Sequence, residues 1–407
     1  MPTRSYVDPR DVLISHQDYF GHDRLARSFL KTLPRLKAGT TVMVHGAPGS
    51  GKNTFLLRCA ALMAHQRDTL DFDPTARVGT WCWYNPWLYL KHGNILSGLV
   101  ATMSKYSESP QALERARDIV GHLNRMHFGD SMPTTSGTGV NRGDVNPVER
   151  VRRGFVQLTE MLRQQNPGRV VVFIEDCDML RPSARLLLLE GLRLLSTENS
   201  SVTFVVAIGR QSALEAMRVR EGAVDDISAA HCLAELVDLD ITVPGLDVRR
   251  ISQLVQKHLG TGAQQVRQAF GSDATDALGA ALTARPLGRP RFLERLSGRV
   301  LLLAEYALDA RTTRELSEAQ WAWVIVSERW PEFRRFMLRG GRDRWLHLRD
   351  ALSRSMGQPQ TESNPEVVAW LQKDLILTDY LRLYADDFER EAESVYWLET
   401  LQLACGL

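Results

Sequence analysis

A glycine-rich segment near residue 50 has the residue types and the spacing of a phosphate-binding loop. The segment contains the pattern G-x-x-x-x-G-K and follows the short apolar run 41–45. Glycines permit a tight turn, backbone N–H groups can point at an anion, and the lysine can contact the outer phosphates. We predict that a nucleoside triphosphate is held by these residues: Gly46, Ala47, Pro48, Gly49, Ser50, Gly51, Lys52, Asn53 and Thr54.

The residue after the lysine departs from this pattern. Serine or threonine is expected there, because its hydroxyl binds Mg2+, whereas this chain has Asn53. An amide oxygen is also a neutral ligand, although the side chain that carries it is longer. Asn53 or Thr54 is therefore the loop residue expected to bind Mg2+.

An acidic turn provides the second half of the predicted site. Glu175, Asp176 and Asp178 directly follow the unbroken apolar run 170–174, which is typical of a central strand covered on both faces. One such carboxylate can hold the water shell of Mg2+, and a neighbouring one can polarise the attacking water. The alternative is a solvated turn, since acidic turns are common. The phosphate loop elsewhere in the chain favours the functional interpretation.

Composition bounds the class of protein. A chain of 407 residues predicts about two or three domains, and a net charge of +2 does not indicate binding to nucleic acid. The five cysteines are odd in number and contain no C-x-x-C pair, which favours a reducing compartment without a zinc site. With no signal-peptide pattern and no apolar run of about 18 residues, we expect a soluble cytoplasmic protein without membrane insertion.

Apolar strands alternate with helices in the first 245 residues. Strands are expected at 41–45, 78–84, 170–174, 202–208 and 236–243. Helices are expected from about residue 22, directly after the phosphate loop, at 88–106 and 111–126, from residue 147, and at 185–195. This alternation predicts the α/β class, with a parallel sheet covered by helices on both faces.

The alternation stops at Pro244-Gly245, and the sequence after it has a helical pattern. We therefore predict a nucleotide-binding domain over residues 1–245, with a polar mobile loop at 129–146. A helical region at 246–307 and a C-terminal helical region at 308–407 are expected to follow.

Four further motifs accompany the phosphate loop. They are the run 83–89 (Trp-Tyr-Asn-Pro-Trp-Leu-Tyr), the acidic turn, and the segments 288–295 and 328–333. In this order they resemble the KAP family of P-loop NTPases, relatives of the STAND and AAA+ groups, over residues from about 18 to about 340. The resemblance implies ATP as the nucleotide, an ASCE-type sheet with strand order 5-1-4-3-2, and a helical lid at 246–307.

The resemblance also implies roles for individual residues. Glu175 would hold the magnesium water shell, Asp176 would be the catalytic carboxylate, and Asp178 would support it. Lys52 would contact the phosphates, and Arg291 of the lid would reach the γ-phosphate. The metal candidates are accordingly Asn53, Glu175 and Asp176.

Many members of the family carry membrane helices inserted in the NTPase domain, and this chain lacks them. The chain also departs from the family pattern at three places. The first acid is Glu175 instead of aspartate, Asn53 replaces the loop hydroxyl, and Gly209-Arg210 stands where a polar residue is expected after the fourth strand. These departures predict slow hydrolysis.

Several residues have two interpretations. Asn85 either positions water or γ-phosphate, or forms a turn with Pro86 while Trp83 and Trp87 fill the core. Arg291 is either the lid arginine or a surface residue. For the others a structural interpretation is favoured: exposed arginines at 210, 218 and 220 instead of an arginine finger, core positions for His45, Trp321, Trp323 and Trp330, and a solvated basic face at 334–344.

Two classes of function are consistent with these features. The first is an ATP hydrolase that uses Mg2+ to drive a conformational or assembly switch, in a prokaryotic regulatory or defence system as the resemblance implies. The second is a nucleotide-binding scaffold or switch with little or no hydrolysis. Self-association or a protein partner is expected for both, whereas the near-neutral charge argues against a nucleic-acid-stimulated motor.

Overall fold

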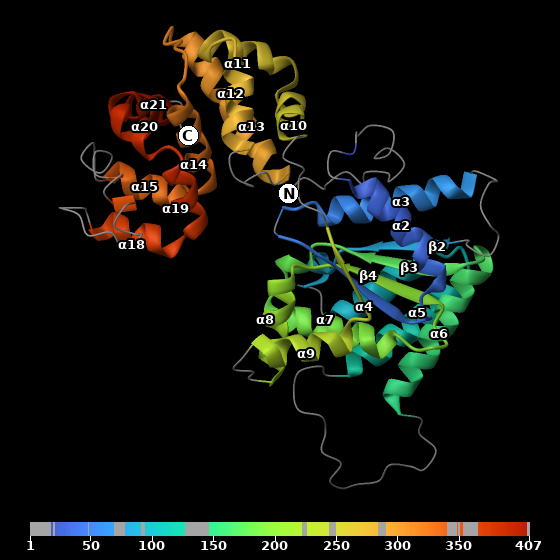
Figure 1. Cartoon of the computed structure of the whole chain (residues 1–407). Coiled ribbons are helices and arrows are strands. Elements are labelled where there is room, and N and C mark those ends of the chain that lie inside the picture. Colours follow the sequence, from blue (N-terminus) through green and yellow to red (C-terminus); the bar gives the residue numbers. More distant parts are fainter. Residues whose placement is uncertain are drawn as a thin grey trace. The chain divides into compact units, whose positions relative to one another are not determined.

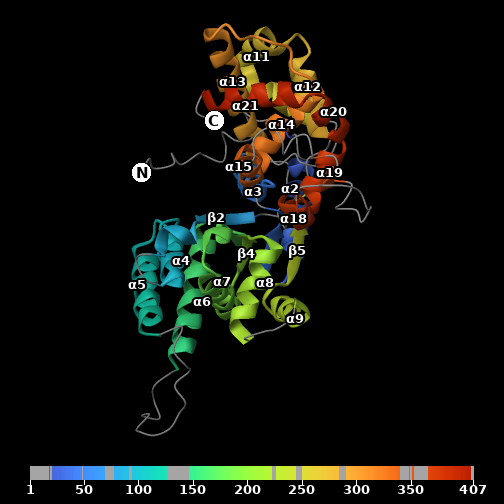
Figure 2. The same ribbon diagram turned by 90° about the vertical axis from the view of Figure 1, so that its left-hand side faces the viewer.

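The computed structural model describes residues 18, 21–47, 49–68, 78–90, 94–126, 146–221, 226–243, 250–283, 290–339, 348, 351–352 and 365–404. The chain divides into two compact units, Met1–Pro244 and Gly245–Leu407, which are drawn in Figure 1 and, turned by 90°, in Figure 2. The first unit contains the phosphate loop and the acidic turn.

The first unit is built on a five-stranded sheet in the order β2-β3-β4-β1-β5. Its strands are β1 (Thr40–His45), β2 (Val78–Tyr84), β3 (Arg169–Ile174), β4 (Val202–Ala207) and β5 (Leu239–Thr242). All four pairings are parallel. This confirms the predicted parallel sheet and, read from the other edge, the predicted order 5-1-4-3-2.

Helices cover both faces of the sheet (Figure 1). On one face lie α2 (His22–Thr32), η1 (Leu33–Arg35) and α3 (Lys52–Asp68). On the other lie α4 (Ile95–Ser104), α5 (Pro110–Arg125), α6 (Pro147–Gln165), α7 (Pro182–Leu195), α8 (Arg210–Glu221) and α9 (Asp226–Leu236). Along β3, Val171 and Phe173 pack on the first face, while Val170, Val172 and Ile174 pack on the second. Both faces are therefore apolar, as the unbroken run predicts.

Two expected elements differ in the structure. The helix expected at 88–106 is divided into η3 (Pro86–Tyr89) and α4, because Asn85 and Asn94 each accept a backbone N–H two residues on and start a new helix there. The strand expected at 236–243 begins only at Leu239, since Leu236 still belongs to α9, a helix that the sequence pattern missed. The loop predicted at 129–146 lies outside the described residues except for Asn146, which caps α6.

The parallel register places the carboxyl ends of β1, β2, β3 and β4 at one edge of the sheet. Tyr84 pairs with Ile174, Ile174 with Val206, and Val44 with Ala207. The residues that follow β1, β2, β3 and β4 therefore emerge side by side. These residues are the phosphate loop, Asn85, the acidic turn and Gly209.

The described part of the second unit consists of helices and their connections, as predicted. They are α10 (Ile251–Leu259), η6 (Gly260–Gly262), α11 (Ala263–Phe270), α12 (Ala274–Thr283), α13 (Pro290–Asp309), α14 (Glu318–Arg329), α15 (Pro331–Arg339), α18 (Pro365–Lys373), α19 (Leu375–Arg382), α20 (Ala385–Arg390) and α21 (Ala392–Ala404). The division of this unit into a lid at 246–307 and a C-terminal region at 308–407 stays a prediction.

A buried ion pair lies in the core of the second unit. Trp321 and Trp323 are buried, as predicted. The indole Nε1 of Trp323 donates to Glu399 Oε2 at 2.6 Å, and Arg334 Nε donates to Glu399 Oε1 at 2.5 Å. The prediction of a solvated basic face is wrong for Arg334, because its guanidinium binds a carboxylate that is only 1% exposed.

The substitution Glu399→Ala is expected to destabilise the protein by about 3–5 kcal/mol, because it leaves the buried guanidinium of Arg334 without its countercharge. Urea unfolding of the full chain measures the loss. Glu332→Ala is the matched control, since its pair with Arg335 is exposed on the surface of α15, and it should cost less than about 1 kcal/mol. Equal losses in the two variants would contradict this assignment.

Candidate functional site

The phosphate loop turns sharply into α3. Gly49 and Gly51 have φ angles of 75° and 95°, in the left-handed region that favours glycine. Ser50 N donates to Ala47 O at 3.0 Å, and Phe55 N donates to Gly51 O at 2.9 Å, which closes the turn and starts the helix. The backbone thus has the compact turn expected of a phosphate-binding loop; Pro48 lies outside the described residues.

His22 packs directly against this loop. A Cβ atom on Gly51 would lie 2.7 Å from His22 Cε1, so glycine is also required there for the close approach of the ring. The Asp18 carboxylate accepts the backbone N–H groups of His22 and Asp23 at 3.0 and 2.9 Å. Asp23 in turn pairs with Arg58 of α3 at 2.9 Å. These contacts fix α2 against the loop and α3.

Sequence reasoning did not identify His22 as part of the site. The available signal was Asp18, an acid that lies four residues ahead of His22 and can accept N–H groups at the start of the helix. Burial lowers the pKa of His22 to about 4; the nearby Asp18 opposes this shift and Arg58 adds to it. The ring is therefore neutral at physiological pH.

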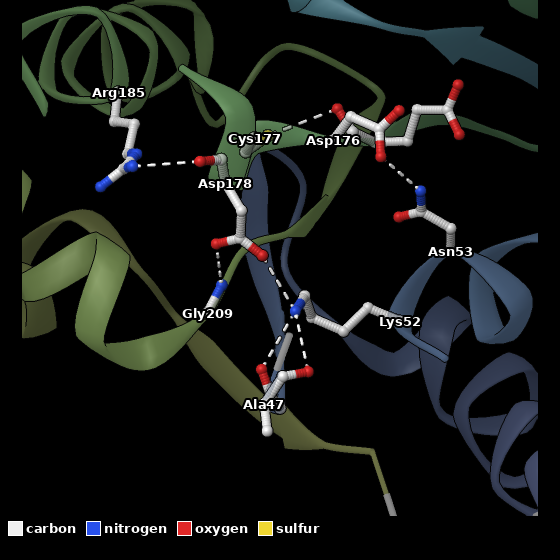
Figure 3. Close-up of polar contacts among 10 residues, drawn as sticks. Ala47, Lys52, Asn53, Asp176, Cys177, Asp178, Arg185 and Gly209 are labelled. Carbon is white, nitrogen blue, oxygen red and sulfur yellow. Dashed lines mark hydrogen bonds and ion pairs between the residues drawn. The ribbon is translucent and has the colours of Figure 1, made fainter. Parts of the chain in front are cut away.

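Lys52 lies among oxygen atoms of the loop and of the acidic turn (Figure 3). Its Nζ atom donates to Gly46 O at 3.0 Å and to Ala47 O at 3.4 Å, and it lies 2.9 Å from Asp178 Oδ2. The side chain is 8% exposed. The structure thus brings the loop lysine together with an acid of the β3 turn, and that acid is Asp178.

Asp178 is held from three sides. Its Oδ1 atom accepts Gly209 N at 2.7 Å, and its backbone oxygen accepts Arg185 Nη2 at 3.1 Å. Burial raises the pKa of Asp178, but the hydrogen bonds from Gly209, Lys52 and the Ser212 side chain outweigh burial and leave the pKa lowered. The carboxylate is therefore ionised beside Lys52.

Asp176 and Glu175 bind two asparagine amides instead. Asn53 Nδ2 donates to Asp176 Oδ1 at 2.8 Å. Asn85 Nδ2 lies 3.2 Å from both Asp176 Oδ2 and Glu175 Oε1. Asp176 has a φ angle of 53° and precedes η4 (Cys177–Met179). This conformation separates its carboxylate from that of Asp178, and the two side chains point in different directions in Figure 3.

Carboxylate and amide groups lie together at this edge of the sheet. The carboxylates of Glu175 and Asp176 and the amide group of Asn53 lie together, and carboxylate and amide oxygens are ligands of Mg2+. Within the described ranges, no group of three or more His, Cys, Asp and Glu side chains is arranged to hold a metal.

Asn85 forms the turn that one of its two interpretations predicts, and its role toward water or γ-phosphate stays a prediction. Its Oδ1 atom caps η3 by accepting Trp87 N at 3.0 Å, while its Nδ2 atom faces the acids. The interpretation that Trp87 fills the core is wrong, because this side chain is 44% exposed; Trp83 packs beside Phe173, with ring centroids 5.9 Å apart.

Arg291, Arg210 and His45 lie on three different elements of the structure. Arg291 is exposed in the first turn of α13, within the second unit, and its role stays a prediction. Arg210 is exposed at the start of α8. His45, at the end of β1, lies 3.2 Å from Thr242 Oγ1 through Nε2.

The profile of the KAP family P-loop domain matches residues 23–307, a range that contains both the loop and the acidic turn. Among solved structures, the crystal structure of a DNA replication initiation factor matches with 10% identity and a TM-score of 0.37, over 97% of this chain and 96% of that chain. No curated protein matches. In the part of the chain that the structure describes, every helix is too short or too polar to cross a bilayer.

The buried ring of His22 predicts a loss of stability in acid. The unfolded histidine binds a proton below about pH 6.5, whereas the folded one does so only below about pH 4. The neutral His22 ring therefore costs no stability above pH 6.5. As the pH drops to 4, the free energy of unfolding falls by about 3 kcal/mol at most.

Urea unfolding between pH 7 and pH 4 measures this loss. His22→Gln should lose less stability over that range than the wild type, while His231→Gln, on the exposed side of α9, should follow the wild type. The assignment would be wrong if both variants had the same pH dependence as the wild type.

Proposed function

The chain belongs to the KAP family of P-loop NTPases, and on this premise we propose that it binds ATP with Mg2+ and hydrolyses it to drive a conformational or assembly switch. One observation supports the proposal most. The residues after the loop glycines contact the acidic turn directly, with Lys52 Nζ at 2.9 Å from Asp178 and Asn53 Nδ2 at 2.8 Å from Asp176. A phosphate held by the loop would lie beside these acids.

The loop and α3 would hold the triphosphate. The left-handed conformations of Gly49 and Gly51 shape a turn whose backbone N–H groups can face an anion. The N-terminus of α3 adds partial positive charge, and Lys52 adds a full one. His22 supports the loop by filling the space next to Gly51.

Oxygen atoms at the same edge would hold the metal. Asn53 or Thr54 would contribute from α3, and Glu175 would contribute through water from the end of β3. When bound, Mg2+ neutralises charge on the phosphate oxygens. The Asn85 amide, which binds both Glu175 and Asp176, keeps the two carboxylates at this edge.

Asp176 would accept a proton from the attacking water. Its carboxylate is oriented by Asn53 on one oxygen and by Asn85 on the other, so its position is set before water arrives. Arg291 would stabilise negative charge on the γ-phosphate from the helical unit. A regulatory or defence role in a prokaryote, with self-association or a protein partner, would use the resulting change of state.

The contacts of Asn53 support the second candidate, a nucleotide switch with little turnover. Both carboxylate oxygens of Asp176 already accept an amide N–H, one of them from the residue that replaces the loop hydroxyl. Water must compete with these donors for the carboxylate. A nucleotide could therefore bind tightly and be hydrolysed slowly.

Two substitutions distinguish binding from hydrolysis. Lys52→Ala should weaken ATP binding by about tenfold or more, because it removes the charge that contacts phosphate. Asp176→Asn should retain binding and slow phosphate release by about 100-fold. Calorimetric titration and phosphate release with Mg2+ measure these effects.

Glu160→Gln, which alters an exposed acid of α6, is the control and should match the wild type. Unchanged ATP affinity in Lys52→Ala would refute the binding site. Tight binding by the wild type without phosphate release would support the switch over the hydrolase.

Restoring the missing hydroxyl gives an independent test. Asn53→Ser removes the Asn53 N–H donor from Asp176 Oδ1 and supplies the usual metal ligand, so we expect phosphate release to accelerate by about tenfold. Asn94→Ser makes the same change at the cap of α4 and should leave the rate unchanged. A slower rate in Asn53→Ser would show that the amide itself assists hydrolysis.

A further inference from the structure

The ammonium group of Lys52 uses all three of its N–H donors within the protein. An ammonium has three donors and no acceptor. Here its nitrogen lies within hydrogen-bond distance of Gly46 O, Ala47 O and Asp178 Oδ2. A phosphate oxygen can therefore bond to Lys52 only if it replaces one of these three oxygens.

Asp178 is the acceptor that a phosphate opposes most strongly. It is the one charged acceptor of the three, and its carboxylate lies 2.9 Å from Nζ. A phosphate that contacts the same nitrogen would place a second negative charge next to the first, and like charges at such distances repel. The two carbonyl oxygens carry no such charge.

Asp178 has other hydrogen-bond donors, which can still bind its carboxylate after Lys52 has turned to a phosphate. Gly209 N and the Ser212 side chain bind it from the start of α8. A Cβ atom on Gly209 would lie 3.1 Å from Asp178 Oδ1, so glycine permits this close contact. Arg185 of α7 holds the backbone oxygen of Asp178 and also bonds to Ser212 O. The carboxylate thus connects the loop lysine to α7 and α8.

We propose that Asp178 competes with phosphate for Lys52, so that nucleotide binding breaks this ion pair and leaves the carboxylate with Gly209 and Ser212 at the start of α8. Asp178 is then a positioning residue that lowers nucleotide affinity and couples occupancy of the loop to α7 and α8. This inference rests on the proposed function, because it concerns the same loop.

Asp178→Asn tests the competition. The substitution keeps the shape of the side chain and an oxygen for Gly209 N, but its NH2 group cannot accept a hydrogen bond from Lys52. We expect the variant to bind ATP and ADP about tenfold more tightly than the wild type, as expected for removal of one charged competitor. Calorimetric titration in EDTA measures binding to the loop without a metal.

Glu215→Gln is the matched control. It removes one negative charge from the same network, where Glu215 pairs with Arg185 at 3.0 Å, and it leaves the three acceptors of Lys52 in place. Its nucleotide affinity should equal that of the wild type. An equal gain in Glu215→Gln would show a general charge effect and overturn the inference.

The remaining outcomes separate the inference from the proposed function. If the wild type binds nucleotide and Asp178→Asn binds equally or more weakly, the competition is refuted while the binding site stands. If wild type and variant both fail to bind, the proposed function itself fails. If Asp178→Asn does not fold, Asp178→Ser decides, because its hydroxyl still accepts Gly209 N and should give the same gain in affinity.

Discussion

The site depends on the parallel register of β1, β3 and β4, which end at the same edge of the sheet. A register shift in either pairing would separate the loop after β1 from the acids after β3, since each residue of a strand spans about 3.3 Å. The register is fixed by apolar side chains packed on both faces of β3, whose alternate residues belong to two different cores. Packing remote from the site therefore determines the contact between Lys52 and Asp178.

Electrostatics explain how three acids fit within four residues of one turn. Asp178 binds Lys52 and Gly209 N, whereas Asp176 and Glu175 bind the amides of Asn53 and Asn85. The left-handed backbone of Asp176 separates the two groups. Donors from the ends of three strands, β1, β2 and β4, thus offset the mutual repulsion of the carboxylates, and Asp178 has a different environment from Asp176 and Glu175.

The sequence alone predicted the strand order through the family resemblance, and the phosphate loop and acidic turn through motifs that follow apolar runs. It did not predict that Asp178 instead of Asp176 or Glu175 contacts Lys52, because that depends on one φ angle and on the backbone N–H of Gly209. The sequence also did not reveal the roles of His22 and Arg334. His22 packs against Gly51, and Arg334 binds Glu399, so both contacts join residues that are distant in the sequence. Periodicity does not report such contacts.

Two departures from the family pattern are linked through the acidic turn. Asn53, in place of the loop hydroxyl, donates to Asp176. Gly209, in place of the polar residue after the fourth strand, donates its backbone N–H to Asp178 and leaves room for that carboxylate. The first departure therefore supplies a side-chain N–H donor to one acid of the turn, and the second removes a Cβ atom that would crowd another acid of the same turn. Donors from outside the turn, after β1 and after β4, thus bind two of its acids.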